Sequence, residues 1–186
     1  MSAAEAKATK VLRADARRNQ DRIVEIAEEL FTRHGKDVQM KQIAERAGVG
    51  VATVYRVFAS KDAMVGAIAA RRFERCLTAA EETLEKDGAA AALREFLRRL
   101  AAVFQGSGAE LRSLLSELPA DQRPTKQSDL VPRLVALHGT WTADGALRPA
   151  LTVEDLRAVI CGLTTSVACG LDADLATDVF QAGITA

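Results

Sequence analysis

The side chains with the clearest chemical potential in this sequence lie between positions 51 and 56. Thr53 contributes a hydroxyl group, Arg56 a guanidinium group, and Val51 and Ala52 small apolar surfaces. In the major groove of DNA, apolar groups contact the thymine methyl, hydroxyls bond bases, and an arginine can donate two hydrogen bonds to guanine. A helix that presents these four side chains together would therefore have the chemistry to read base edges.

Two short helices joined by a glycine turn are predicted to position these side chains. The expected buried positions, spaced by three or four residues within each helix, are Ile43, Ala44, Ala47, Val54 and Phe58. Gly48 supplies the backbone freedom that ends the first helix, and Val49 returns an apolar side chain to the core. The pattern predicts a helix-turn-helix whose second helix contacts DNA.

The segment resembles the tetracycline-repressor (TetR) family of transcriptional regulators over roughly residues 17–68. The matching residues of the motif are Ile43-Ala44, Ala47-Gly48-Val49, Thr53-Val54-Tyr55, Phe58 and Lys61. Upstream, the family's first helix and its closing glycine are matched by Arg22-Ile23-Val24 through Ala27, Leu30-Phe31 and His34-Gly35. The resemblance implies an all-α chain, in which an N-terminal three-helix head with the helix-turn-helix precedes a C-terminal helical body for effector binding and dimerisation.

The resemblance also implies which side chains of the head contact DNA. The expected base-facing residues are Lys41, Val51, Ala52, Thr53 and Arg56. The expected phosphate contacts are Arg17, Tyr55 and Lys61, and Arg18 adjoins the first helix as a further basic candidate. For Tyr55 the alternative is that its ring packs beside Val49 and exposes only the hydroxyl. The implied function is a homodimeric repressor that binds an inverted-repeat operator and is released by a small-molecule effector.

Two residues depart from the family pattern, both at helix starts where a side-chain oxygen usually accepts a backbone N–H. Gln39 replaces the usual Thr or Ser, and Gly50 replaces the usual Ser or Thr. Gly costs little at an N-cap, whereas Gln is a poor cap and is expected to weaken its helix by up to about 1 kcal/mol.

The charge is unevenly distributed along the 186 residues, although the formal net charge is zero. Residues 1–61 carry 12 Lys and Arg against 8 Asp and Glu, a net of +4, and residues 62–186 carry 13 against 17, a net of −4. A basic head suits contact with phosphate, although a difference of this size is common in ordinary domains. The predicted domains are a flexible basic arm (1–16), the DNA-binding head (17–61) and the helical body (62–186).

Several other classes of protein find no support in the sequence. No secretory leader or long apolar run is present, so we expect a cytoplasmic protein. Cys76, Cys161 and Cys169 lack metal-ligand spacing and are expected to be buried thiols. The two histidines have no neighbours at ligand spacing and catalytic motifs are absent, so we expect neither metal, cofactor nor enzymatic activity.

In the body, helices are expected at about 60–84, 93–104, 111–118, 129–143 and 152–170, followed by an apolar C-terminal segment. Ser60 and Thr152 are the predicted caps of two of these helices. Candidate pocket residues, each with plain core as the alternative, are Phe96, Phe104, Leu118, Trp141 and Cys161. Candidate dimer-interface residues, with packing inside one chain as the alternative, are Ala158, Gly162, Ser166, Val179 and Phe180.

Two other functions remain open from the sequence. The chain could be a constitutive DNA-binding dimer whose body recruits a protein partner without a small ligand. It could also be a helical enzyme or carrier in which the motif occurs by chance. A ligand response would argue against the first, and DNA affinity would argue against the second.

Overall fold

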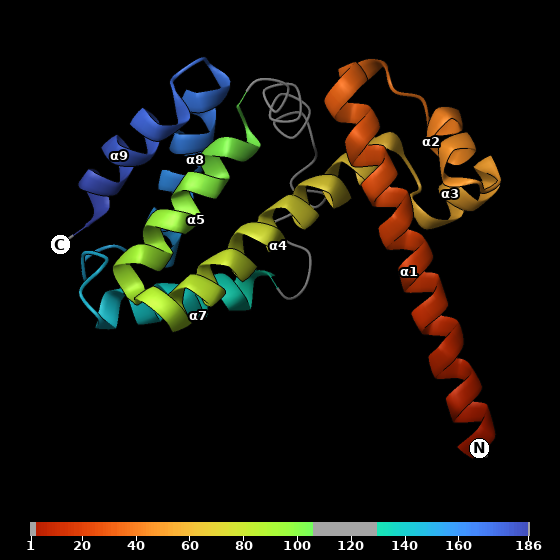
Figure 1. Ribbon diagram of the computed structural model, residues 1–186, viewed down its shortest axis with the longest axis horizontal. Helices are drawn as coiled ribbons and strands as arrows, with labels where there is room; N and C mark the ends of the chain where they lie inside the picture. Colours follow the sequence, from red (N-terminus) through yellow and green to blue (C-terminus); the bar gives the residue numbers. More distant parts are fainter. Residues whose placement is uncertain (1–2, 106–129, 186) are drawn as a thin grey trace. The chain divides into compact units, whose positions relative to one another are not determined.

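The computed structural model describes the backbone of residues 3–105 and 130–185, and every regular element in those ranges is helical (Figure 1). The predicted all-α fold is therefore confirmed. The chain separates into two compact units, Met1–Met64 and Val65–Ala186, where the sequence predicted a boundary after residue 61. The predicted helix at 111–118 lies outside the described residues.

The first unit, the head, is built on one long helix. Its elements are α1 (Ala3–His34), a short 3-10 helix (Gly35–Asp37), α2 (Met40–Ala47), α3 (Val51–Val57) and the first residues of α4 (Lys61–Asp87). In the head α2 packs against α1, and α3 packs against α2 (Figure 1). Its apolar core is formed by Ile23, Val24, Ala27, Leu30, Phe31, Val38, Met40, Ile43, Ala44, Ala47, Val54, Phe58 and Met64.

Helix α1 begins within the segment that the sequence predicted to be a flexible basic arm. Its backbone is helical from Ala3, so the segment at 3–16 continues the same helix that carries the core residues of the head. The segment lacks the apolar periodicity of the residues that follow it. However, α1 contains neither Gly nor Pro and is rich in Ala, Glu, Lys and Arg, the residues with the strongest helix propensities.

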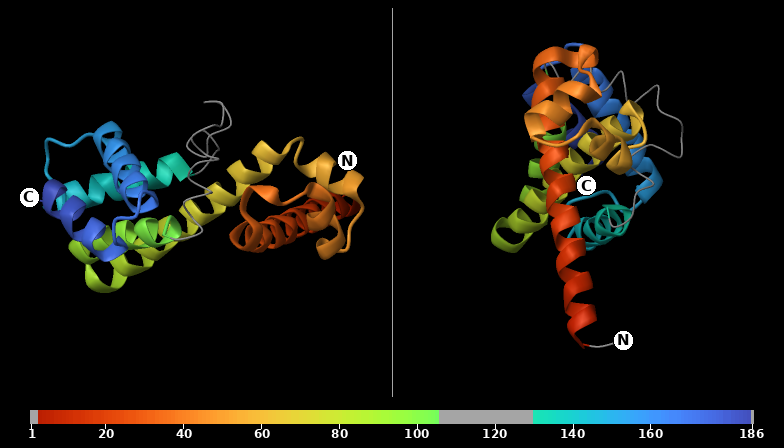
Figure 2. Two further views of the ribbon diagram at one scale, coloured as in Figure 1. Left: turned by 90° about the horizontal axis from the view of Figure 1, so that it is seen from above. Right: turned by 90° about the vertical axis from the view of Figure 1, so that its right-hand side faces the viewer.

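Among its described residues, the second unit, the body, contains the rest of α4 and four further helices. They are α5 (Ala89–Val103), α7 (Leu130–Ala143), α8 (Val153–Ala168) and α9 (Ala173–Ile184). Helix α5 contacts α7, α8 and α9, and α8 also contacts α9 (Figure 2). Among the described helices, none is apolar over a length that could cross a membrane.

The predicted caps of α4 and α8 are confirmed. The Ser60 hydroxyl accepts a hydrogen bond from the Ala63 N–H at 3.0 Å. The Thr152 hydroxyl accepts from the Asp155 N–H at 3.1 Å, and the Asp155 carboxylate accepts from the Thr152 N–H at 2.9 Å. Hydrogen bonds from the Thr152 hydroxyl and backbone also hold the pKa of Asp155 below its ordinary value. Each helix therefore begins at a residue whose side chain satisfies backbone donors.

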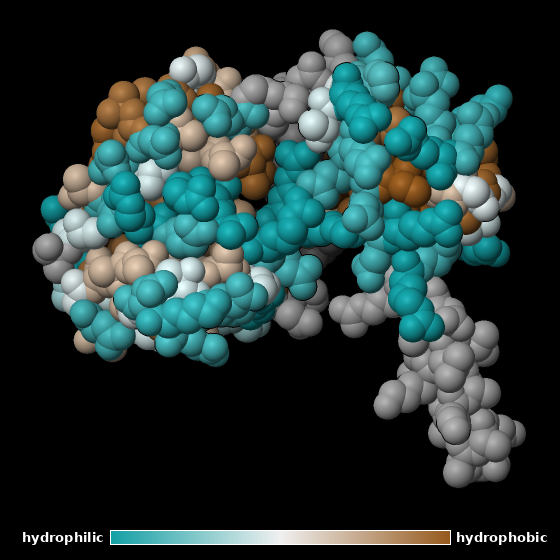
Figure 3. Space-filling model, viewed as in Figure 1, coloured by the Kyte–Doolittle hydropathy of each residue, from teal (hydrophilic) through white to brown (hydrophobic). Residues whose placement is uncertain are grey.

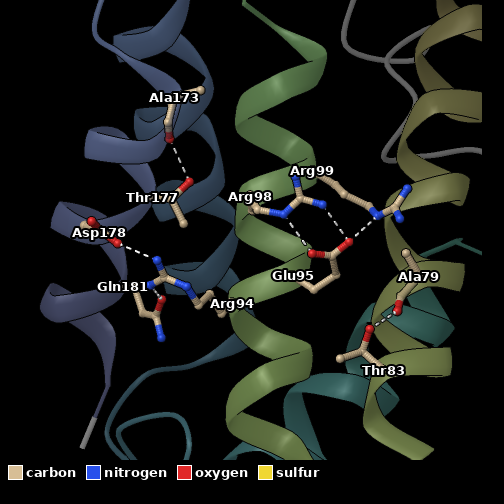
Figure 4. A network of polar contacts seen from close by, with 10 residues as sticks. All are labelled: Ala79, Thr83, Arg94, Glu95, Arg98, Arg99, Ala173, Thr177, Asp178 and Gln181. Atoms are coloured by element: carbon tan, nitrogen blue, oxygen red, sulfur yellow. Dashed lines mark hydrogen bonds and ion pairs between the residues drawn. The ribbon is translucent and has the colours of Figure 1, made fainter. Parts of the chain in front are cut away.

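Polar side chains join the helices of the body (Figure 4). The Arg94 guanidinium on α5 donates to Asp178 at 2.8 Å and to Gln181 at 2.9 Å, both on α9. On α7, Arg133 donates to the Glu81 carboxylate at 2.8 Å and to the Thr78 hydroxyl at 2.8 Å, both on α4. Glu81 pairs across helices because Arg133, distant in sequence, folds beside it.

The three cysteines differ in burial, which corrects the prediction that all are buried. Cys76 is buried in the body core, whereas Cys161 and Cys169 are exposed. Cys161 lies within α8, and Cys169 follows the last residue of that helix. Apolar neighbours in the sequence therefore did not indicate burial within one chain.

We expect the Cys76 thiol to resist iodoacetamide in the folded protein. Burial raises its pKa from 9.0 to about 12, and the thiolate is the reactive species. The thiol has a higher pKa in the folded protein than in the unfolded chain. As the pH rises above 9, only the unfolded thiol ionises, so the free energy of unfolding should decrease. Peptide mass spectrometry after labelling at pH 8, with and without urea, tests this. Rapid labelling of Cys76 without urea would contradict the structure.

Candidate nucleic-acid interface

The turn between α2 and α3 sets the direction of α3. Gly48 ends α2 in the left-handed conformation, with φ of +66°. Its N–H donates to the Glu45 carbonyl, and the Val49 N–H donates to the Ala44 carbonyl at 3.0 Å. These bonds satisfy carbonyls that the helix end leaves without partners, and they turn the chain sharply into α3.

Replacing Gly48 with Ala should destabilise the head by about 1 kcal/mol, because a side chain is strained in the left-handed region. The added methyl group would meet only ordinary contacts, with the Arg22 guanidinium 3.7 Å away, so the cost lies in the backbone. Gly139, inside α7 with open space around it, is the matched control. There Ala should stabilise by about 0.5–1 kcal/mol. Urea unfolding followed by circular dichroism should therefore show a lower free energy of unfolding for Gly48→Ala and a higher one for Gly139→Ala. Equal changes in the two variants would refute the argument.

The start of α2 is better capped than the sequence predicted. The Gln42 side chain accepts a hydrogen bond from the Gln39 N–H at 2.8 Å. This bond satisfies a backbone donor at the helix start, so the expected weakening is at least partly offset. Gly50 has no side chain to cap α3, as expected.

Helix α3 buries one side and exposes the other. Val54 is fully buried, while Val51, Ala52, Tyr55 and Arg56 are exposed. Half of the Tyr55 surface, 50%, is accessible to solvent. Thr53 and Val57 are half-buried at the edges of the exposed face. The base-facing residues predicted on α3 therefore lie on the solvent side, as a helix that enters a groove requires.

Two of these side chains contact each other. The Arg56 guanidinium donates to the Thr53 hydroxyl across one turn, with 3.4 Å between Nη2 and Oγ1. The contact is long and exposed, so it orients the arginine only weakly. Both groups retain capacity to bond base edges.

The other predicted basic residues lie in different surroundings. Lys41 is exposed and lies 3.7 Å from the Glu45 carboxylate on the same helix. The Lys61 ammonium lies 5.5 Å from the centre of the Phe31 ring, an arrangement that favours a cation. Arg18 is exposed on α1, while for Arg17 only the helical backbone is described.

Sequence reasoning missed two arginines near the turn. Arg22 is exposed and its guanidinium reaches the vicinity of Gly48. Arg46 on α2 lies 3.5 Å from Glu29 on α1 and joins the two helices. Arg22 follows Arg18 by four residues, which places both on one side of α1. That spacing was the available signal for a longer basic stripe.

In the body, the candidate pocket residues fall into three groups. Phe96 and Trp141 are fully buried in the body core, and Phe104 is also buried. Cys161 is exposed, so in one chain it does not line the interior. Leu118 lies outside the described residues.

The candidate interface residues are also divided. Ala158 and Val179 are exposed, and Gly162, Ser166 and Phe180 are half-buried. A Cβ at Gly162 would lie 2.9 Å from the Phe180 ring, so the missing side chain permits close packing of α8 on α9. For these two residues the contact is within one chain. Figure 3 shows hydrophobic surface over part of α9, where Leu175 and Val179 are more than half exposed.

In comparisons with known proteins, sequence matches cover only part of the chain, whereas structural matches cover nearly all of it. The family described as "Bacterial regulatory proteins, tetR family" matches residues 23–68. Helix-turn-helix transcriptional regulators of Staphylococcus aureus are 43% identical over 51 residues, which make up 27% of this chain. The matched segment spans only 28% of the length of those relatives.

Solved structures match nearly the whole chain. A TetR transcription regulatory protein from Mycobacterium vanbaalenii is 29% identical, with a TM-score of 0.63, over 94% of this chain and 99% of that one. A TetR transcriptional regulator from Streptomyces coelicolor is 25% identical, with a TM-score of 0.58, over 89% and 98% of the two chains. The similarity thus extends through the body as well as the head.

Proposed function

Because the chain belongs to the tetR family of DNA-binding bacterial regulatory proteins, we propose that it is a homodimeric repressor released from an inverted-repeat operator by a small-molecule effector. The observation that carries the proposal is the exposed face of α3. There Arg56, Thr53 and Tyr55 combine a bidentate donor with two hydroxyls on a helix held by a buried opposite side. This combination fits base readout flanked by phosphate contacts.

The dimer is supported by the surface of α8 and α9. Residues 158–171 contain no charged side chain, yet Ala158, Cys161 and Thr165 are exposed. On α9, Leu175 and Val179 add exposed apolar groups. The uncharged stretch of α8, together with the apolar groups of α9, is suited to burial against a second copy, because an isologous interface brings the same surface of both subunits together.

The effector response is supported by the position of α4 in the chain. Its first residues belong to the head, and the rest belongs to the body. A ligand that binds the body with different affinity in two arrangements of α4 would shift the population between DNA-competent and incompetent dimers. The alternative is a constitutive DNA-binding dimer, in which the body recruits a protein and no ligand changes operator affinity.

Selection of the purified protein against a random DNA pool tests the proposal. We expect enrichment of an inverted repeat whose half-sites are about one helical turn apart or more. Binding without enrichment, lost with added salt, would refute sequence-specific regulation. The selected site then allows operator affinity to be measured with fractions of a cell extract, and an affinity that none of them changes would favour the constitutive dimer.

Replacing Lys61 with Ala should weaken binding to all DNA sequences alike, since a phosphate contact carries no base information. The slope of log affinity against log salt should become shallower by about 0.9 for each lost phosphate contact. Lys61→Arg, which keeps the positive charge near Phe31, should retain most of the slope. Lys86→Ala, an exposed lysine in the last turn of α4, is the control and should leave the slope unchanged. Loss confined to one sequence class would show that Lys61 contacts a base.

A further inference from the structure

The only tryptophan of the chain is buried with its polar atom unpaired. Trp141 is 0% exposed, and its indole N–H has no hydrogen-bond partner among the described residues. The other buried polar side chains in those residues are satisfied. Thr164 donates to the Ile160 carbonyl at 2.9 Å, and Thr177 donates to the Ala173 carbonyl at 2.8 Å. An unpaired buried donor is uncommon in proteins and requires an explanation.

Aromatic rings extend from this indole towards the edge of the body core. The Phe96 ring on α5 lies 5.4 Å from Trp141, and the Phe73 ring on α4 lies 5.9 Å from Phe96. Trp141 and Phe96 are fully buried, whereas Phe73 is half-buried. The three rings therefore lead from the unpaired N–H to the helix that continues into the head.

The surroundings of the indole define what could pair with it. The core that contains Trp141 is apolar and includes Leu93, Leu97, Leu134, Leu137 and Leu147. A ligand carboxylate placed there would lose its hydration without gaining a cation, which is strongly unfavourable. A neutral carbonyl oxygen loses far less and gains the indole N–H as its donor.

We propose that the Trp141 N–H is the polar anchor of an effector that is apolar, uncharged and carries a carbonyl or ester oxygen. This inference rests on the proposed ligand response of the body. The chemical class of the effector is inferred from the indole nitrogen, the one buried side-chain N or O atom of the described residues that lacks a hydrogen-bond partner.

The anchor is also tied to α4 by a polar contact. Trp141 and Arg133 both lie on α7, and Arg133 donates to Thr78 and Glu81 of α4. A ligand that displaces Trp141 or the adjoining rings would therefore act on α4 at two places, at Phe73 and at the partners of Arg133. These contacts connect effector binding with the helix that reaches the head.

Nuclear magnetic resonance of the full-length, ¹⁵N-labelled protein tests the anchor directly. A single tryptophan gives a single indole N–H signal, which Trp141→Phe assigns by its disappearance. The probes are phenyl ketones from acetophenone to octanophenone. Each is paired with the alkylbenzene of the same length, in which a methylene replaces the carbonyl. The pairs differ only in the acceptor, so the comparison does not depend on the variant being well folded.

We expect at least one ketone to move the indole proton signal downfield and to bind about tenfold more tightly than its alkylbenzene partner, because one hydrogen bond to a buried donor is gained. In Trp141→Phe the ketone should lose this advantage and bind no more tightly than its alkylbenzene partner, because its carbonyl would be buried without a donor. The proposal is overturned if the signal is already that of a hydrogen-bonded indole without ligand, or if no ketone moves it. Either result would leave operator selection unaffected, so the failure of the anchor and that of the proposed DNA function are distinguishable.

Discussion

Replacing Arg56 with Ala should relax the preference of the protein at one base pair in each half-site of its operator. The guanidinium lies on the exposed face of α3, one turn from Thr53, and its bidentate pairing with guanine would discriminate against other bases by about 1–3 kcal/mol. Binding to the altered operators should then approach binding to the preferred one. Selection of the variant against the random pool gives the measurement, since the information content of each position is read separately.

Two further variants make the Arg56 result specific. Arg56→Lys keeps the charge but cannot present the planar fork of donors, so it should lose most of the discrimination while retaining general affinity. Arg157→Ala removes an exposed arginine from α8 in the body and should leave the base preference intact. An unchanged preference in Arg56→Ala would remove this residue from the group that reads the operator.

Introducing a carboxylate on α9 should abolish the proposed dimer. Val179 is 56% exposed in one chain, and a charge there would be buried without a partner if α9 pairs with a second copy. Val179→Glu should therefore sediment as a monomer in analytical ultracentrifugation. Affinity for the full operator should fall by about 100-fold or more, because each separate head would hold only one half-site.

Val135→Glu is the matched control for the dimer prediction. Val135 lies on α7 and is 47% exposed, so both substitutions add one charge at a similarly open position. The control should remain a dimer with operator affinity close to that of the parent protein. If Val135→Glu dissociates and Val179→Glu does not, the interface lies on α7 and the assignment to α8 and α9 is wrong.

The local features of the head could be predicted from the sequence because they depend on residues close together in the chain. The need for glycine at position 48 follows from the turn that it forms itself, and the burial of Ile43 and Val54 follows from the apolar spacing within their own helices. The cap at Thr152 is equally local, since Asp155 is three residues away. In each case the interacting residues lie within a few positions of one another in the sequence.

Features that depend on residues distant in sequence could not be predicted. Glu81 pairs with Arg133 because α4 and α7 meet in the fold, and nothing near Glu81 indicates this. Cys161 is exposed, whereas Leu156 and Leu163 on the same helix are buried in the body core, and the sequence does not show which of them the other helices cover. The unpaired N–H of Trp141 also depends on which side chains close around it.

Because α4 is long, a small rotation of this helix moves its far end by a distance comparable with the spacing of DNA base pairs. Its 27 residues rise by about 1.5 Å each, so the helix is a lever arm of about 40 Å. A rotation of about 5° at one end moves the other by about 3.5 Å, close to the rise of one base pair along the duplex. Two such levers moving in opposite directions would misplace the paired recognition helices by about two base pairs. Loss of operator binding would then require no unfolding of either unit.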